Sequence, residues 1–429
     1  MWLQVLYWII AVSIFLIIVA RPLLGVYFSV AVMTYQTNFL GLYFSPGEIV
    51  SVALGVGLLI KIYTSKEMPD LKNWIIVLVV LFCAWLGISF LFSYFDSNYY
   101  LLRRMASIVL TFVSIIYFVK NIKQIKTILL IMVIAGWADV TYGIADYLKY
   151  KNEVLNLSII NLQTLFRPTG FSGDPNYLAL YLTVLIPLSF YLFFIFKNKI
   201  VKFFLLCSSL LFVGFVVLTY SRGGFLGLGL VLFLIFFKQG KHFLRLGLLI
   251  FLLVVVIFAS SNYRQRILTI PGLATAEKRL SDDSIDNRIF YSKLALQLFF
   301  QNPIIGVGLG NFKIETPDTR VALSQVTHNT YLELAAETGI IGLSIFMILI
   351  GLAIWRLRWC SHWFKILRDH ELFYISEALE ISMWAFLFGS LFLSTQYEKT
   401  FWFLLAILAS LSRILGKMLV IAKRSRVKL

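Results

Sequence analysis

A single histidine and a set of arginines are the residues of this sequence whose types best suit chemistry. His328 stands in the segment Thr-His-Asn-Thr and is one of four histidines in the chain. An imidazole with its ordinary pKa of about 6.5 is a common general base at neutral pH. Arginine stays ionised and holds phosphate through its planar fork. Together these residue types predict a site that binds a phosphate group and removes a proton.

Arg222 is the arginine with the most informative surroundings. It lies in Leu-Thr-Tyr-Ser-Arg-Gly-Gly, between two apolar runs joined by very few residues. Ser221 can cap the helix that follows, and Gly223 and Gly224 let a ligand approach the backbone. The N–H groups and dipole of that helix start would help the guanidinium to hold an anion. The alternative is an arginine that only reaches lipid headgroups at the membrane boundary.

Arg167 lies at a second edge of this kind, in Phe-Arg-Pro-Thr-Gly-Phe-Ser-Gly-Asp-Pro-Asn. Asp174 is a natural N-cap and Pro175 a natural first helical residue, so Asp174, Pro175 and Asn176 have a structural explanation. Arg167 has no explanation as convincing, and we keep it as a candidate ligand for phosphate.

Membrane-spanning helices must position these residues. The chain has 429 residues, of which 60% are hydrophobic and 14% charged, and its mean hydropathy is +0.87. This composition excludes a soluble enzyme. Because a bilayer core requires about 20 apolar residues per helical span, we predict an all-α polytopic membrane protein with about 12 or 13 transmembrane helices. The apolar runs lie at residues 3–20, 23–42, 47–62, 74–95, 105–119, 127–145, 177–196, 203–220, 223–237, 243–259, 340–355, 372–393 and 401–415.

Basic residues orient the spans. Lys and Arg outnumber Asp and Glu by 38 to 21. Basic turns recur after every second span, so all of them can lie on one face, which the positive-inside rule makes cytoplasmic. They fall at residues 61–72, 120–126, 197–202, 238–245, 356–368 and in the tail 413–428.

The opposite face carries two long connections, residues 148–176 and 260–339, and an unexpected number of arginines. About 15 of the 38 basic residues fall on this face, where the rule predicts few. An arginine cluster at an outer membrane edge indicates a phosphate-bearing lipid ligand. The arginines concerned are Arg103, Arg104, Arg167, Arg222, Arg264, Arg266, Arg279, Arg288 and Arg320. Arg103 and Arg104 have a simpler reading, as anchors of a short outer turn.

The spans and connections divide the chain into three predicted parts. Residues 1–259 form an N-terminal transmembrane bundle, residues 260–339 a loop region outside the membrane, and residues 340–429 the last spans with a basic tail. A connection of about 80 residues is usually functional. Within it, Arg288 opens a helix predicted over 287–300, and His328 starts another that leads back to the membrane.

Two motifs carry less weight than their residue types suggest. Gly306, Gly308 and Gly310 imitate part of a dinucleotide fingerprint, but no βαβ unit surrounds them. We expect them to form a tight turn where the loop packs on the membrane. Asp282, Asp283 and Asp286 match no metal-binding loop, and we expect a solvated loop or a cap for the helix that starts at Asn287.

Other features narrow the class of protein. Cys83, Cys207 and Cys360 show no paired spacing, so neither a disulfide framework nor a zinc site is indicated. The first apolar run lacks a basic leader and a small-residue cleavage site, and we expect it to be a retained span.

Few ionisable residues lie within the predicted spans: Asp139, with Glu377 and Glu380 nearer a cytoplasmic end. Transporters place such groups or broken helices at the midplane. Here the polar residues gather at one surface, which favours an interfacial enzyme over a flippase.

Four segments in this order resemble the O-antigen ligase and O-antigen polymerase superfamily of bacterial envelope glycan assembly. They are FRPTGFSGDPNYLALYL, LTYSRGGFLGL, DDSIDNRIFYSKLALQLFFQNPIIGVGLGNF and THNTYLELAAETGIIGLSIF. They extend over Phe166–Phe346, less than half of the chain. Their combination is specific, although each segment alone is a weak signal.

The resemblance implies a GT-C-type membrane glycosyltransferase that needs no nucleotide sugar, metal or cofactor and has no nucleic-acid partner. Its donor would be a glycan on undecaprenyl pyrophosphate, and its active site would face the periplasm from the bacterial inner membrane. By the same resemblance, His328 would be the catalytic residue, and Arg222, Arg288 and Arg167 would bind the donor pyrophosphate. His328 would take the proton from a sugar hydroxyl as it attacks the anomeric carbon with inversion.

The expected function is that of an O-antigen ligase in lipopolysaccharide biosynthesis, which moves glycan from undecaprenyl pyrophosphate to lipid A core. The alternative is an O-antigen or exopolysaccharide polymerase, whose acceptor is another lipid-linked repeat unit. A transporter of lipid-linked glycan without catalysis is a third hypothesis, from a different class. The motifs do not separate the first two because both use the same donor chemistry.

Overall fold

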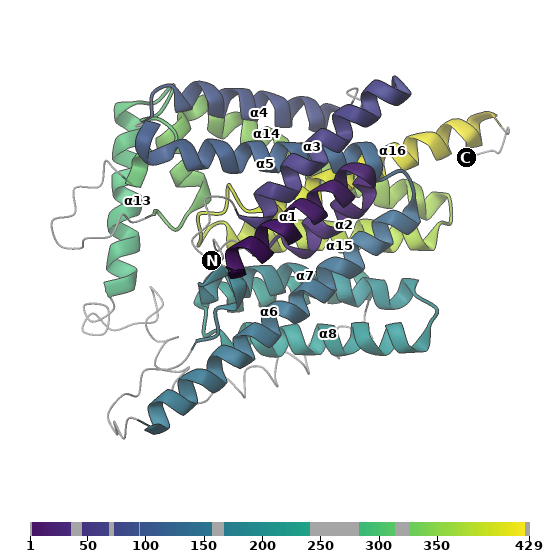
Figure 1. Cartoon of the computed structure of the whole chain (residues 1–429), viewed down its shortest axis with the longest axis horizontal. Helices are drawn as coiled ribbons and strands as arrows, with labels where there is room; N and C mark the ends of the chain where they lie inside the picture. Colours follow the sequence, from purple (N-terminus) through teal and green to yellow (C-terminus); the bar gives the residue numbers. More distant parts are fainter. Residues whose placement is uncertain are drawn as a thin grey trace.

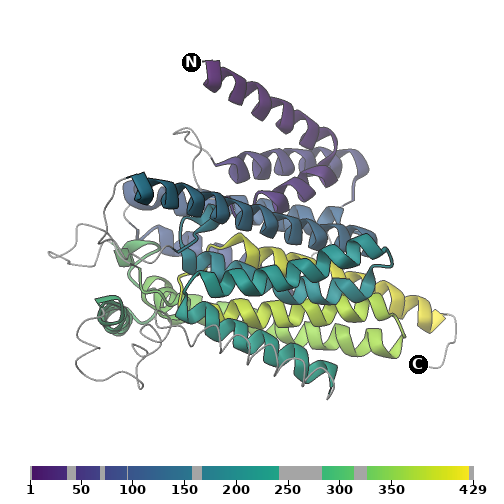
Figure 2. The ribbon, with the colours of Figure 1, turned by 90° about the horizontal axis from the view of Figure 1, so that it is seen from below.

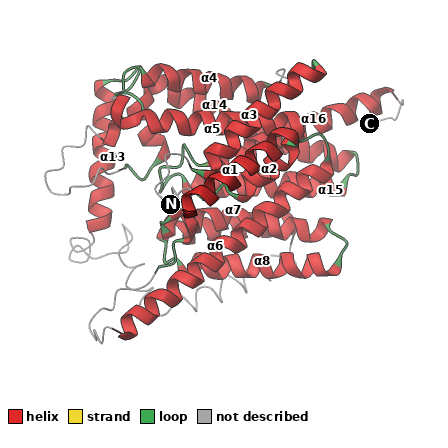
Figure 3. Cartoon of the chain, viewed as in Figure 1, coloured by secondary structure: helices red, strands yellow, loops and turns green. Residues whose placement is uncertain are grey.

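A computed structural model describes residues 2–35, 45–67, 73–93, 95–156, 167–240, 283–313 and 326–424. Every regular element within these ranges is a helix, as Figure 3 shows. The helices are α1 (Trp2–Ala20), α2 (Pro22–Ala31), α3 (Pro46–Ser65), α4 (Trp74–Phe90), α5 (Phe95–Phe118), α6 (Ile122–Asn156), α7 (Pro175–Ile195), α8 (Lys199–Leu218), α9 (Arg222–Gln239), α13 (Asp283–Gln301), α14 (Thr330–Ile366), α15 (His370–Gly389) and α16 (Lys399–Arg424), with 3-10 turns at Gly170–Ser172 and Asn311–Lys313.

The helices confirm a polytopic all-α membrane protein. Within the described ranges, nine helices are long and apolar enough to cross a membrane: α3, α5 to α9 and α14 to α16. Shorter apolar helices lie in α1, α2 and α4. Each predicted span in these ranges overlaps one of these helices, while the run at 243–259 lies outside the described residues. In the second run, α2 ends at Ala31, and residues 36–42 lie outside the described residues.

Two helices form the centre of the bundle. Of the 18-residue apolar stretch in each helix, 83% is buried in α7 and 72% in α15, against 33% in α8. α7 packs on α6, α8, α9 and α15, and α14 packs on α4 and α15. Figure 2 shows these helices running side by side along the bundle. The segments that flank α7 and α15 therefore meet at the bundle ends.

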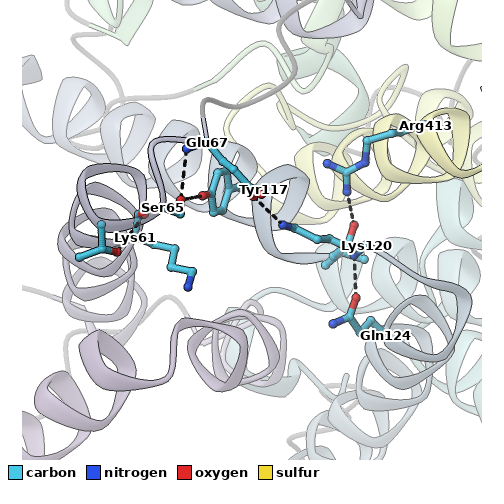
Figure 4. A network of polar contacts seen from close by, with 9 residues as sticks. Lys61, Ser65, Glu67, Tyr117, Lys120, Gln124 and Arg413 are labelled. Carbon is cyan, nitrogen blue, oxygen red and sulfur yellow. Dashed lines mark hydrogen bonds and ion pairs between the residues drawn. The ribbon is translucent and has the colours of Figure 1, made fainter. Parts of the chain in front are cut away.

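The basic turns gather at one end of the bundle, as their spacing predicted. The Lys120 ammonium lies 3.2 Å from the Glu67 carboxylate and that of Lys126 lies 2.7 Å from Glu371. Arg413 of α16 donates a hydrogen bond to the carbonyl of Val119. Figure 4 shows the part of this network around Lys120 and Arg413. These contacts join the ends of α3 and α5, the starts of α6 and α15 and the middle of α16 at one face.

Charged residues near this end of α15 are paired. Lys238 at the end of α9 lies 2.8 Å from Glu377 and 2.6 Å from Glu380. Arg358 of α14 lies 3.0 Å from the other oxygen of Glu380. Ion pairs of this kind account for two of the acidic residues in the predicted spans, and they tie α9, α14 and α15 together.

The other end of the bundle carries α13, which lies across it in Figure 1. Tyr291 and Leu298 of α13 form a small apolar cluster with Phe312 and with Ala336 of α14. The helix predicted over 287–300 is confirmed, and it ends at Gln301, directly before Asn302.

A glycine-rich turn follows α13 and packs against α14 near Glu337. Gly306, Gly308 and Gly310 all have positive φ, which confirms the predicted tight turn. A Cβ at Gly306 would lie 2.4 Å from the backbone carbon of Glu337. The Gly308 N–H donates to the carbonyl of Glu337 at 3.1 Å. The turn therefore packs directly against the backbone of α14, and a side chain at Gly306 would force the two apart.

The two ends should face opposite sides of the membrane. Lys199 begins α8 at the basic end and Asn302 follows α13 at the other, and both are exposed. We expect a membrane-impermeant maleimide to label N302C in intact cells and K199C only after lysis, in a chain whose Cys83, Cys207 and Cys360 are changed to alanine. Labelling in the reverse pattern would invert the predicted orientation.

Candidate functional site

The two predicted edge segments meet at the end of the bundle opposite the basic turns. The Arg167 guanidinium donates from Nε to the carbonyl of Thr219 at 2.8 Å and from Nη2 to Oδ1 of Asn176 at 3.2 Å. The Ser221 hydroxyl donates to the same Asn176 oxygen at 2.8 Å. Arg167 and Asn176 therefore join the start of α7 to the turn between α8 and α9. They bring the first two motifs together, although more than 40 residues separate Asn176 from Ser221.

The helix starts at this edge are capped as predicted. Asp174 accepts from the N–H groups of Asn176 at 2.6 Å and Tyr177 at 3.4 Å, and Pro175 is the first residue of α7. Ser221 accepts from the N–H of Gly224 at 3.2 Å. Arg222 is the first residue of α9 and is half-buried. Ser221 and Gly223, the residues on either side of Arg222, therefore belong to the helix start that was predicted from the sequence.

A cleft opens between α7, α9 and α15 beside Arg222. Asn176, Ser221, Gly223 and Gly224 line it, together with Leu180, Thr183, Gly227, Ala385, Gly389, Phe392 and Leu393. Arg288 of α13 also lines it. A Cβ at Gly224 would lie 2.5 Å from Cβ of Ala179, so only glycine lets α9 approach α7 this closely. The cleft thus has a polar end at the helix starts, with an arginine from the loop helix, and an apolar remainder between the spans.

His328 lies in a strained turn directly before α14. Its φ is +53°, a value rare for residues with a side chain. The next residue, Asn329, caps α14 by accepting from the N–H groups of Tyr331 at 3.0 Å and Leu332 at 3.1 Å. The imidazole is half-buried, and its buried Nδ1 has no hydrogen-bond partner in the part of the chain that the structure describes. No described residue therefore fixes which ring nitrogen of His328 carries the proton.

The electrostatic surroundings of His328 suit a general base. Burial lowers the pKa of its imidazole from the ordinary value of 6.5, and the nearby Arg288 guanidinium lowers it further, while the Asp174 carboxylate acts in the opposite direction. A lowered pKa keeps the ring neutral at pH 7. The imidazole of His328 therefore lies within electrostatic range of Arg288 and of Asp174, the residue that caps α7.

Glu333 holds the histidine turn in place, a role that the sequence analysis did not assign. Its carboxylate accepts from the N–H and hydroxyl of Thr327 at 3.2 and 3.0 Å, and from the Ser394 hydroxyl. Its second oxygen accepts from Nε2 of Gln396 at 2.7 Å. The side chain is buried in α14, one turn after the cap. A glutamate within the apolar stretch Leu-Glu-Leu-Ala-Ala-Glu was the available signal, because a buried carboxylate requires partners.

Two of the outer arginines are structural. Arg103 lies 2.7 Å from a carboxylate oxygen of Glu48, and Arg104 lies 3.0 Å from one of Glu398. These ion pairs agree with their expected role as anchors. Four further predicted outer arginines, Arg264, Arg266, Arg279 and Arg320, lie outside the described residues.

The aspartates before Asn287 differ from their expected place. α13 begins at Asp283, so Asp283 and Asp286 lie in its first turn and not in a loop ahead of the helix. Asp282 lies outside the described residues.

The comparison with known protein families gives one match. Residues 207–347 match the sequence model of the O-antigen ligase family. This stretch begins in α8 and contains Arg222, Arg288 and His328, and Arg167 precedes it. No curated protein matches the chain. The family match agrees with the four motifs and with the bundle of apolar helices: residues 207–347 are similar to the O-antigen ligase family, within a chain whose helices make it a multi-pass membrane protein.

Proposed function

We propose that this protein is a GT-C-type glycosyltransferase that transfers a glycan from undecaprenyl pyrophosphate to an acceptor hydroxyl at the periplasmic face of the inner membrane. The observation that carries the proposal is that Arg288 lines the cleft between α7 and α9 and lies within electrostatic range of His328. The cleft combines a cationic, helix-start end for a pyrophosphate with an apolar remainder for a polyprenyl chain.

The arginines would stabilise the leaving group. As the bond between the anomeric carbon and the pyrophosphate oxygen breaks, its electron pair stays on undecaprenyl pyrophosphate. Arg222, Arg288 and Arg167 would neutralise the charge that develops there, and no metal is needed for this task. Arg167 already donates two hydrogen bonds within the edge, but a guanidinium has five N–H donors and can also bind a phosphate oxygen.

His328 would activate the acceptor. Its neutral imidazole takes the proton of a sugar hydroxyl while that oxygen bonds to the anomeric carbon from the side opposite the leaving group. One displacement of this kind inverts the anomeric configuration. Arg288 contributes to both halves of the reaction because it lines the cleft and also lowers the pKa of His328.

The acceptor that we propose is the lipid A core, which would make the protein an O-antigen ligase of lipopolysaccharide biosynthesis. The second candidate is a polymerase that extends lipid-linked repeat units with the same donor chemistry. Purified protein in lipid separates them: transfer to lipid A core supports the ligase, and lengthening of lipid-linked repeats without lipid A overturns it.

Loss of the base should abolish transfer but leave donor binding intact. We expect His328→Ala to lower the transfer rate about 10²- to 10⁴-fold, the usual contribution of a general base. The exposed His362 at the basic end provides the control, because His362→Ala should leave the rate unchanged. Full activity of His328→Ala, with flux of lipid-linked glycan across the membrane, would instead favour a transporter.

The fork of Arg222 should matter more than its charge. Lysine keeps the charge but loses the bidentate geometry, so Arg222→Lys should lower the transfer rate by more than about tenfold. Arg424→Lys, at the exposed end of α16, is the matched control. Transfer kinetics at fixed donor concentration measure the effect, and a near-normal rate would reduce Arg222 to a membrane anchor.

The pH dependence of the transfer rate should follow the pKa of His328, and removal of Arg288 should change it. Because the pKa of His328 is lowered, its base form persists as the pH falls, and transfer should decline only below pH 6.5. Arg288→Gln removes a cation that lowers this pKa, so the acid limb should move to higher pH even when donor is saturating. Arg103→Gln, whose arginine pairs with Glu48, is the control. An acid limb at the same pH in both variants would contradict the assignment of the base.

A further inference from the structure

A second cavity lies on the other side of the histidine turn. Its volume is about 260 Å³. The start of α5, the edge that precedes α7, the Gly310–Lys313 turn, the start of α14 and the segment 394–398 line it. The cavity and the cleft share none of their lining residues.

Three buried polar side chains that line this cavity hold atoms without hydrogen-bond partners in the described part of the chain. They are Oε2 of Glu337, Oε1 of Gln396 and the hydroxyl of Tyr397. Glu337 and Gln396 are each 2% exposed and Tyr397 is 9% exposed. Buried polar atoms in folded proteins are almost always hydrogen-bonded, and leaving one unpaired is costly. Three such side chains in the wall of one cavity make it a polar chamber, which suits a ligand rich in hydroxyl groups.

The side chains around the cavity are rigidly supported. The Gly308 N–H donates to the backbone carbonyl of Glu337, and the Trp402 indole donates to the carbonyl of Gln396 at 3.1 Å. Gln396 also uses its Nε2 on Glu333. The groups without partners are therefore held in place before any ligand arrives, which lowers the entropic cost of binding.

The cavity adjoins the turn that carries His328. Val326, two residues before His328, lines the cavity, and so does Glu333, whose carboxylate holds the turn through Thr327. Arg288, which lines the cleft, and Asp174, which lines the cavity, both act electrostatically on the imidazole. The proposed base therefore lies near residues of both the cleft and the cavity.

We propose that this cavity binds the acceptor sugar, and that it selects a neutral or amino-bearing ring over an anionic one. The proposal rests on the proposed transferase function and names the acceptor class. Four carboxyl groups line the cavity, those of Asp174, Glu333, Glu337 and Glu398, against two cations, Arg104 and Lys313. Arg104 pairs with Glu398, and burial disfavours the charged form of Glu337, so Asp174 and Glu333 against Lys313 leave a weakly acidic field. Carboxylate and amide oxygens accept from sugar hydroxyls or ammonium groups, whereas a uronic acid or sugar phosphate is repelled.

Direct binding tests this inference without any transfer reaction. The full chain in lipid nanodiscs is titrated with methyl glucoside, glucosamine, glucuronate and glucose 6-phosphate, and binding is followed by saturation-transfer NMR. We expect the neutral and amino sugars to bind, and the two anionic sugars to bind at least about tenfold more weakly. Equal binding of all four probes, or binding of none, would overturn the proposal.

Two conservative variants locate the binding site. Glu337→Gln and Tyr397→Phe keep side-chain shape and remove one acceptor or one hydroxyl, so each should weaken binding of methyl glucoside by about fivefold or more. Glu67→Gln and Tyr191→Phe make the same changes away from the cavity, at an exposed pair of the basic end and within α7, and should leave binding unchanged. Equal affinities for cavity variants and controls would place the sugar elsewhere and overturn the proposal.

Transfer kinetics distinguish failure of this inference from failure of the proposed function. In an active enzyme, Glu337→Gln and Tyr397→Phe should raise KM for the acceptor and leave KM for the donor unchanged. If His328→Ala abolishes transfer while the cavity variants leave the acceptor KM unchanged, the cavity assignment fails and the transferase function stands. If probes bind in the cavity but His328→Ala transfers normally, the sugar site stands and the catalytic function fails.

Discussion

The arrangement of the site depends on one buried carboxylate. Glu333 accepts hydrogen bonds from Thr327, Ser394 and Gln396, and so ties the histidine turn to the segment between α15 and α16. A buried carboxylate without such partners would carry a large desolvation penalty, so the four donors and the carboxylate require one another. The turn that carries His328 is therefore held to the segment between α15 and α16.

His328 and Arg288 are held in place by different parts of the fold. His328 is attached to the end of α15, whereas Arg288 is carried by α13, which packs on α14 through Tyr291 and Leu298. The glycine turn then fixes the distance between α13 and α14, because Gly306 lies in contact with the backbone of Glu337. The proposed base and phosphate ligand thus come from different elements, and the packing of α13 on α14 contributes to their separation.

Features that depend on neighbours in the chain could be predicted from the sequence. Apolar runs predicted the spans, and Asp174 and Ser221 were recognisable as caps because their partners lie two or three residues away. The contacts that assemble the site are of another kind: the partners of Glu333 on the 394–396 segment are more than 60 residues distant. No local pattern encodes such a contact. The same reason explains why Gln396 and Tyr397 were missed, since neither belongs to a motif and only the fold brings them to Glu337.

The kink of α14 allows one helix to serve both the site and the membrane. Gly339 has φ of +64°, and a Cβ there would lie 2.2 Å from the carbonyl oxygen of Ile304. The helical turns before it carry Glu333 and Glu337, which are four residues apart and therefore share a face. Glu333 uses that face to hold the histidine turn, and Glu337 uses it to line the second cavity. A residue other than glycine at this position would push α14 away from Ile304 and move both carboxylates together. The relation between base and cavity therefore depends on a backbone conformation at a residue that takes no part in the chemistry.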